Sequence, residues 1–230
     1  MGNCIGKKEN HQKAETLEKS NTLSNEKEPE IDFESEFNVM WQDFGDETKI
    51  HDDSLRLFFD KIEIKKDSAE EFLTTYILKC QTLAVITQPE LFEYCKLNEL
   101  NSWDALANSI QEKIREYSED KKHMRLFFKY IFEKSSDYPK VIETKLAIPI
   151  LEILIELFPW SLANRFLVYL KMYRKSEHLK IDEWEHIPVF LIEHKDGLHD
   201  YNEEDSAFPR LFDEFVKSMS STFIRVLTHE

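Results

Sequence analysis

The spacing of apolar residues predicts helices along most of the chain. Apolar side chains from Phe33 to Phe44 recur every three or four residues, as on one face of a helix, and Gly45 follows. Further segments with helical spacing or a nearly continuous apolar character are 126–132, 143–157, 161–172, 181–194 and 206–226. We expect eight or nine helices, no β-hairpin and an all-α fold.

Polar residues mark where several of these helices begin. Ser68-x-x-Glu71 and Thr87-x-x-Glu90 are capping-box patterns, in which each side chain bonds the other residue's backbone N–H group. Ser102 can cap the helix that follows it. These patterns predict helix starts at three points between residues 68 and 103.

The domain organisation follows from changes in composition. Residues 1–30 contain no Phe, Trp or Tyr and are rich in Ser, Asn, Lys and Glu, which is typical of a disordered tail. Residues 31–45 form a short amphipathic helix, which either packs back onto the domain, the interpretation that we favour, or docks in a groove of a partner. Residues 50–226 form the main helical domain.

Composition excludes several classes of protein. The 230 residues include only four glycines, so loops that cradle phosphate and folds rich in β-turns are not expected. The formal net charge is −15, which argues against nucleic acid as a partner because phosphate binding needs a basic surface. No run of about 18 apolar residues is present to span a bilayer.

Chemistry-bearing residues do not gather into a recognisable catalytic or metal site. The three cysteines (Cys4, Cys80 and Cys95) have no CxxC spacing, which indicates a reducing, cytoplasmic compartment. His186 and His194 could share a helix face but have no third ligand at suitable spacing. Residues 200–211 begin like a calcium loop but lack its glycine at position six and its glutamate at position twelve. We expect no catalytic residue, no metal and no cofactor.

Acidic charge is concentrated near the C-terminal end. Residues 177–214 hold twelve acids and only three Lys or Arg, and so carry nine of the fifteen net negative charges. The segment is either a solvated acidic face or a surface that docks a basic partner. Four histidines lie in the same segment, so its negative charge should weaken below about pH 6.5.

The same acidic segment carries a family resemblance. The stretch from Lys180 to Val216 reads KIDEWEHIPVFLIEHKDGLHDYNEEDSAFPRLFDEFV. It resembles the C-terminal signature of the defective-in-cullin-neddylation family, the potentiating-neddylation (PONY) domain. The matching parts are Asp182-Glu183-Trp184, Tyr201 to Glu204, Ala207-Phe208-Pro209 and Leu211 to Val216. Weaker agreement covers Phe127 to Phe132, Lys140 and Ala147-Ile148, and the resemblance fades through residues 54–120.

The resemblance implies a fold and a function. The domain would have a divergent EF-hand-like N-terminal half and a C-terminal helical half. The protein would be a scaffold-type E3 co-ligase without a covalent intermediate. It would bind the winged-helix C-terminal domain of a cullin, the acetylated N-terminus of the neddylation conjugating enzyme (E2), and the RING subunit of the cullin complex. The alternative is an acylated acidic adaptor that binds cullin without stimulating neddylation.

The resemblance also implies a cullin-binding patch of Asp182, Ala207 and Asp213. Two carboxylates can pair with Lys or Arg of the cullin, and a small methyl group allows close approach of its backbone. The plainer alternative is that both aspartates only face solvent or cap helices. Three positions depart from the family pattern: Phe208 and Leu151 each replace a Trp, and Asp205-Ser206 replaces a glycine before Ala207. We expect Leu151 only to repack the core.

The first residues indicate attachment of lipid. Met1-Gly2-Asn3-Cys4 resembles an N-myristoylation site at Gly2 with a palmitoylation site at Cys4, although position 6 is Gly instead of the preferred Ser or Thr. One myristoyl chain binds membranes only marginally, so Cys4 would supply the second signal. The alternative is a chance occurrence in a tail. We therefore expect a cytoplasmic protein with a membrane-associated fraction, and a nuclear pool is compatible with the sequence.

Overall fold

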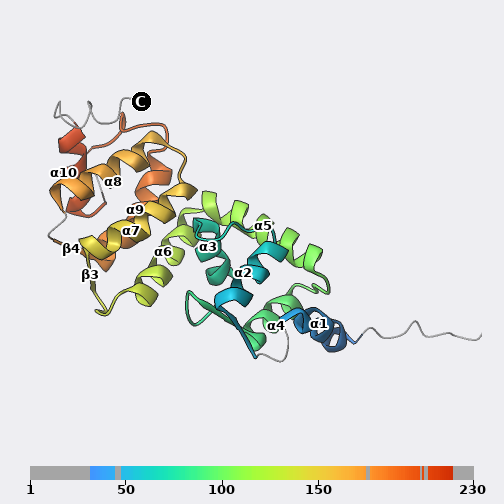
Figure 1. Cartoon of the computed structure of the whole chain (residues 1–230). Helices are drawn as coiled ribbons and strands as arrows, with labels where there is room; N and C mark the ends of the chain where they lie inside the picture. Colours follow the sequence, from blue (N-terminus) through green and yellow to red (C-terminus); the bar gives the residue numbers. More distant parts are fainter. Residues whose placement is uncertain (1–31, 45–47, 175–176, 203, 205–206, 220–230) are drawn as a thin grey trace, which may run out of the picture. The chain divides into compact units, whose positions relative to one another are not determined.

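The computed structural model describes residues 32–44, 48–174, 177–202, 204 and 207–219. The predicted mostly helical fold is confirmed, with ten α-helices in these ranges instead of eight or nine (Figure 1). They are α1 (Phe33–Trp41), α2 (Asp52–Lys61), α3 (Ala69–Ile77), α4 (Gln88–Leu97), α5 (Trp103–Glu119), α6 (Lys121–Ser135), α7 (Thr144–Leu154), α8 (Ser161–Tyr173), α9 (Ile181–Glu193) and α10 (Arg210–Met219). Two 3₁₀ helices, η1 (Gln42–Phe44) and η2 (Ile155–Leu157), follow α1 and α7.

The N-terminal half has the layout of paired EF-hands. Strand β1 (Lys49–His51) lies between α1 and α2, and β2 (Val85–Thr87) lies between α3 and α4. The two strands pair antiparallel with Ile50 opposite Ile86, and both side chains are fully buried. Two helix–loop–helix units joined through their loops in this way form an EF-hand-like pair, as the resemblance implies.

The C-terminal half repeats this layout. Strand β3 (Val141–Glu143) lies between α6 and α7, and β4 (His178–Lys180) lies between α8 and α9. They pair antiparallel around the buried residues Ile142 and Leu179, as the adjacent labels in Figure 1 indicate. The sequence shows no repeat at a fixed period, because each pairing needs only three residues and the helices between them differ. We therefore find a structural repeat that the residue pattern did not predict.

Helix α1 belongs to the core of the N-terminal half. Phe37 is buried and meets Phe92 of α4 edge to face, with ring centroids 5.0 Å apart. Phe44 meets Trp103 of α5 in the same way at 5.5 Å. The apolar face that the sequence places before Gly45 thus packs against the domain, which is the interpretation that we favoured over docking in a partner.

The predicted caps form, with one difference. Thr87 and Glu90 make the reciprocal capping box, in which the Thr87 N–H donates to the Glu90 carboxylate at 2.8 Å. Ser102 accepts the N–H of the third residue of α5, Ala105. Ser68 caps α3, but the carboxylate of Glu71 accepts the N–H of Asp67 instead of that of Ser68. The caps predict the starts of these helices correctly.

Three helices end in a left-handed residue that is not glycine. Glu63, Lys79 and Glu99 have φ of 58°, 58° and 55° and follow α2, α3 and α4. In each case the next N–H donates back to the last turn of the helix, as in Cys80 N–H to Thr75 C=O at 2.9 Å. Such a conformation costs a non-glycine residue about 1–2 kcal/mol. Tight helix ends therefore form in this domain without glycine at the left-handed position.

The C-terminal half is built on the contact between α6 and α9. Trp184 of α9 is fully buried against the rings of Phe128 and Phe132 of α6. Its indole N–H donates to the Phe128 carbonyl at 2.7 Å. This one side chain therefore supplies both apolar packing and a buried hydrogen bond between the two helices.

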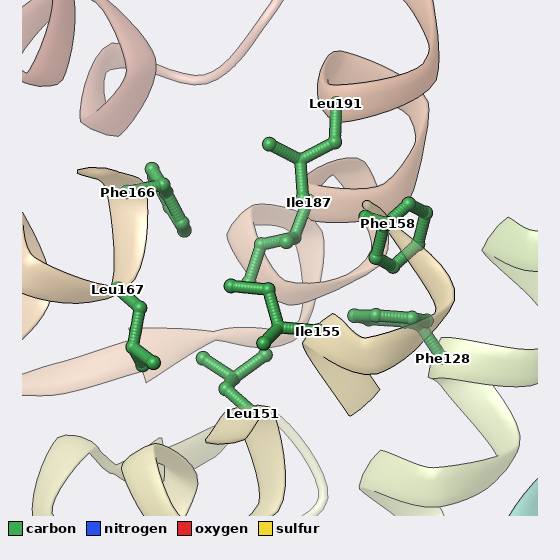
Figure 2. A pocket seen from close by; sticks show the side chains of 8 residues that line it. All are labelled: Phe128, Leu151, Ile155, Phe158, Phe166, Leu167, Ile187 and Leu191. Carbon is green, nitrogen blue, oxygen red and sulfur yellow. The ribbon is translucent and has the colours of Figure 1, made fainter. Parts of the chain in front are cut away.

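Leu151, which stands where the family has Trp, lies at the wall of a small apolar void (Figure 2). The void is lined only by apolar side chains, so a water molecule inside it would find no hydrogen-bond partner. Its wall comes from α6, α7, η2 and the residue after it, α8 and α9: Phe128, Leu151, Ile155, Phe158, Phe166, Leu167, Ile187 and Leu191. Leu151 is thus buried in the apolar core with a void beside it, and the repacking of the core around it stays a prediction.

Candidate functional site

Asp182 lies in the first turn of α9 and is accessible to a partner. Its side chain is 63% exposed, and one carboxylate oxygen lies 3.3 Å from Nδ1 of His186, one turn further along the helix. The same ring nitrogen lies 2.7 Å from the backbone carbonyl of Asp182. An acidic side chain at this end is also favoured by the helix dipole. Asp182 is thus oriented by its own helix while remaining exposed.

Asp213 lies on α10 and is half-buried. Its Oδ1 atom accepts a hydrogen bond from the hydroxyl of Tyr201. The Asp213 carboxylate, which we expect to bind the cullin, therefore also connects α10 to the segment that precedes it. The sequence analysis did not assign this role to Tyr201, although the residue lies within the family motif.

Ala207 is exposed and lines a surface hollow between α9 and the segment before α10. Phe208 forms part of the same wall and packs edge to face on Phe190 of α9, with centroids 5.3 Å apart. A smaller aromatic ring is thus accommodated where the family has Trp. The other lining residues are His186, Val189, Glu193, His194, Asp200, Tyr201 and Asn202. Asp205-Ser206, the departure beside Ala207, lies outside the described residues.

The last helix starts later than the apolar spacing predicts. We expected it over 206–226, but α10 begins at Arg210. Residues 207–209 are not helical, and the N–H of Phe212 donates to the Pro209 carbonyl at 3.0 Å. The expected end of this helix falls on residues outside the described part. The later start leaves Ala207 in a non-helical segment, where its methyl group and backbone can face a partner.

Cations from outside the acidic segment neutralise part of its charge. Glu185 pairs with Arg125 at 3.2 Å and Glu193 with Lys121 at 2.8 Å, both from α6. Arg174, which ends α8, lies within ion-pair distance of three more carboxylates. A count over residues 177–214 leaves these cations out, because Lys121 and Arg125 lie 72 and 60 residues from their partners and Arg174 lies just before the segment. The acidic character is therefore less uniform than the sequence indicates.

Burial lowers the pKa of His194; the nearby charge of Lys121 lowers it further, and Glu193 and Asp200 oppose the shift with smaller effects. The imidazole packs against Phe190, with centroids 4.8 Å apart, and its Nε2 is buried without a hydrogen-bond partner. We predict from the sequence that protonation of four histidines weakens the negative charge of this segment below about pH 6.5. For His194 this prediction is wrong. The imidazole stays neutral to a lower pH because the charged ring would lose its hydration.

This burial predicts how stability depends on pH. As the pH falls below about 7, the unfolded chain takes up a proton at His194 before the folded domain does, so the free energy of unfolding decreases until the lowered pKa is passed. We expect His194→Phe to reduce this dependence in urea unfolding measured between pH 7 and pH 5. His199→Gln, at an exposed position, is the control, and an equal change in both variants would contradict the assignment.

The two described cysteines are buried. Burial raises the pKa of both thiols, that of Cys95 to about 12. Cys80 follows α3 instead of lying in a helix. Both thiols are therefore protonated at neutral pH, which makes them poor nucleophiles.

Metal-binding and membrane-spanning features were the remaining possibilities for the described residues. These residues contain no group of three or more His, Cys, Asp or Glu that could hold a metal ion. None of the helices in these ranges has the length and apolar character needed to cross a bilayer. Gly2 and Cys4, the predicted lipidation residues, lie outside the described part.

The fold and the surface define a class of protein. A helical domain presents a surface hollow between α9 and the segment before α10. Two residues that line it contact the assigned aspartates, His186 beside Asp182 and Tyr201 beside Asp213, which suits a protein-docking module. The family model for cullin binding matches residues 105–218, from α5 to α10, and so includes Asp182, Ala207 and Asp213. The chain therefore belongs to the cullin-binding family, that of the PONY-domain proteins, and a cullin is its partner. No curated protein matches the chain.

Proposed function

We propose that the chain is a scaffold-type co-ligase for cullin neddylation. It binds the winged-helix domain of a cullin through α9 and α10, and the acetylated N-terminus of the conjugating enzyme through the N-terminal half. Together with the RING subunit, it promotes transfer of the Rub/Nedd modifier to a cullin lysine. The observation that carries this proposal is the family match, which includes Asp182, Asp213 and the hollow lined by Ala207.

The surface suits a basic partner. Asp182 is exposed for a Lys or Arg, and the hollow beside Ala207 and Phe208 offers apolar contact. Opposite charges speed encounter and orient the complex, while desolvated pairs slow dissociation. Holding enzyme and cullin together raises the effective concentration of the reacting groups without any catalytic residue in the scaffold.

The N-terminal half offers a second hollow, between the end of α3 and α4. Leu97 is 77% exposed at this hollow and Tyr94 and Ile77 also line it. An exposed leucine beside an apolar wall is suited to the side chain of a partner residue such as methionine. This feature supports a binding role for the half of the domain that precedes the family match.

A single-turnover assay tests the proposal. Conjugating enzyme charged with the modifier is mixed with a cullin–RING complex, with and without the full chain. We expect the full chain to increase the rate of transfer at least about tenfold through proximity. Binding of a peptide with the acetylated N-terminus of the conjugating enzyme is measured in parallel. No increase in rate and no peptide binding would contradict the co-ligase proposal.

A second candidate function is favoured by the extent of the family match. Residues 50–104, most of the N-terminal half, precede it. An adaptor that lost the conjugating enzyme would keep the cullin contact and recruit or sequester the cullin. In the same assay this adaptor would bind the cullin and leave the transfer rate unchanged or lower.

We further propose that Gly2 and Cys4 are acylated and hold a fraction of this cytoplasmic protein at membranes. The sequence Met1-Gly2-Asn3-Cys4 supports the proposal, since two acyl chains are needed for stable attachment. Gly2→Ala should move the membrane fraction to the soluble fraction, as measured by cell fractionation. Cys95→Ala, which removes a buried thiol, is the control. The same distribution for Gly2→Ala and the unaltered chain would contradict acylation.

A further inference from the structure

Arg174 lies at the end of α8 and is surrounded by carboxylates. Its guanidinium lies 2.6 Å from Glu177, 2.7 Å from Glu214 and 3.8 Å from Glu183. The arginine side chain is only 16% exposed. Ion pairs with this degree of burial are screened by salt less than pairs at the surface.

The three carboxylates come from different elements. Glu177 precedes β4, Glu183 lies in the first turn of α9, and Glu214 lies on α10. Glu183 also accepts the N–H of Lys180 at 2.8 Å, so its carboxylate is held at the start of α9. One cation therefore connects α8 to both helices of the cullin-binding surface.

The positions of two of these acids matter for that surface. Glu183 follows Asp182 directly, and Glu214 follows Asp213 directly. We propose that Arg174 is a positioning residue for cullin binding, because it holds α9 and α10 in the arrangement in which the two aspartates meet the cullin. This inference rests on the proposed role of Asp182 and Asp213.

Two physical effects support the proposal. The other contacts of α10 with α8 and α9 are mainly aromatic, such as the stacked rings of Phe212 and Phe166, and aromatic pairs accept more than one arrangement, offset-stacked or edge to face. Ion pairs and charge-assisted hydrogen bonds do select a geometry. In addition, removal of Arg174 would leave Glu183 and Glu214 without its opposing charge and would separate the helices through repulsion.

The test compares Arg174→Met with Arg125→Met in the full chain. Arg125 also pairs with an acid of α9, Glu185, but forms no ion pair with α10 among the described residues. Each variant loses one positive charge, so the two differ in the link to α10. We expect Arg174→Met to weaken binding of the isolated cullin winged-helix domain about tenfold, a typical coupling between sites. Arg125→Met should change binding less than about twofold, because Arg125 is 47% exposed and its pair joins α6 to α9 only. Titration calorimetry measures both, at a temperature where urea unfolding shows each variant to be folded.

A double-mutant cycle separates positioning from general destabilisation. If Arg174 positions Asp213, then Asp213→Asn costs less affinity in the Arg174→Met background than in the unaltered chain, by about threefold or more. Equal losses in both backgrounds would overturn the inference. If Arg174→Met does not fold, the cycle uses Glu214→Gln in place of Arg174→Met, because this variant breaks the same ion pair from α10. If the unaltered chain itself fails to bind the cullin domain, or Asp213→Asn has no effect, the proposed function of the patch fails instead.

Discussion

Asp213→Lys is expected to lower the affinity for a cullin winged-helix domain by at least about 100-fold, because truncating one partner of a buried interfacial charge pair costs about 2–5 kcal/mol and a reversed charge adds repulsion. The substitution also removes the acceptor of the Tyr201 hydroxyl, which loosens the segment that presents Ala207. Titration calorimetry with the full chain measures the loss. Neddylation in the single-turnover assay should fall with it.

Two variants accompany this experiment. Glu112→Lys reverses the charge of an exposed residue on α5 and should leave cullin affinity nearly unchanged. Asp182→Ala should weaken binding less than Asp213→Lys, since Asp182 is well exposed and remains near water in the free protein. Equal affinity of Asp213→Lys and Glu112→Lys would show that α10 is not part of the cullin surface.

Trp184→Ala is expected to reduce the free energy of unfolding by about 3–5 kcal/mol, the usual cost of truncating a fully buried aromatic residue. The loss includes the tilted ring contacts with Phe128 and Phe132 and the hydrogen bond to the Phe128 carbonyl. Domains are stabilised by only about 5–15 kcal/mol in total, so the variant should be marginally stable. Urea unfolding followed by circular dichroism measures the change.

Trp184→Phe separates the two contributions. It keeps an aromatic ring at the contact between α6 and α9 but removes the indole N–H, so it should cost less than the alanine variant. Leu126→Ala, at a partly exposed position of α6, should cost less still. A small effect of Trp184→Ala, similar to that of Leu126→Ala, would contradict the central place of Trp184 in the C-terminal half.

Several features of the fold could be predicted because they depend on neighbouring residues. The apolar spacing from Phe33 to Phe44 and the Thr87–Glu90 capping box act within one or two turns, and both form as expected. The start of α10 was placed wrongly, because apolar spacing alone does not locate the first turn after Pro209. The left-handed conformation of Glu63, Lys79 and Glu99 after their helices is not typical of Glu or Lys, so the sequence did not predict it.

By itself, the sequence determined that the protein is helical and acidic, and the motif around Asp182, Ala207 and Asp213 identified its family. Only the tertiary structure decided how these residues are held. The bond from Tyr201 to Asp213, the ion pairs of Arg174 with Glu183 and Glu214, and the buried imidazole of His194 join residues on different elements or depend on their packing. Helix formation is governed by local periodicity and caps, whereas charge pairing and burial depend on distances in space that residue order does not contain.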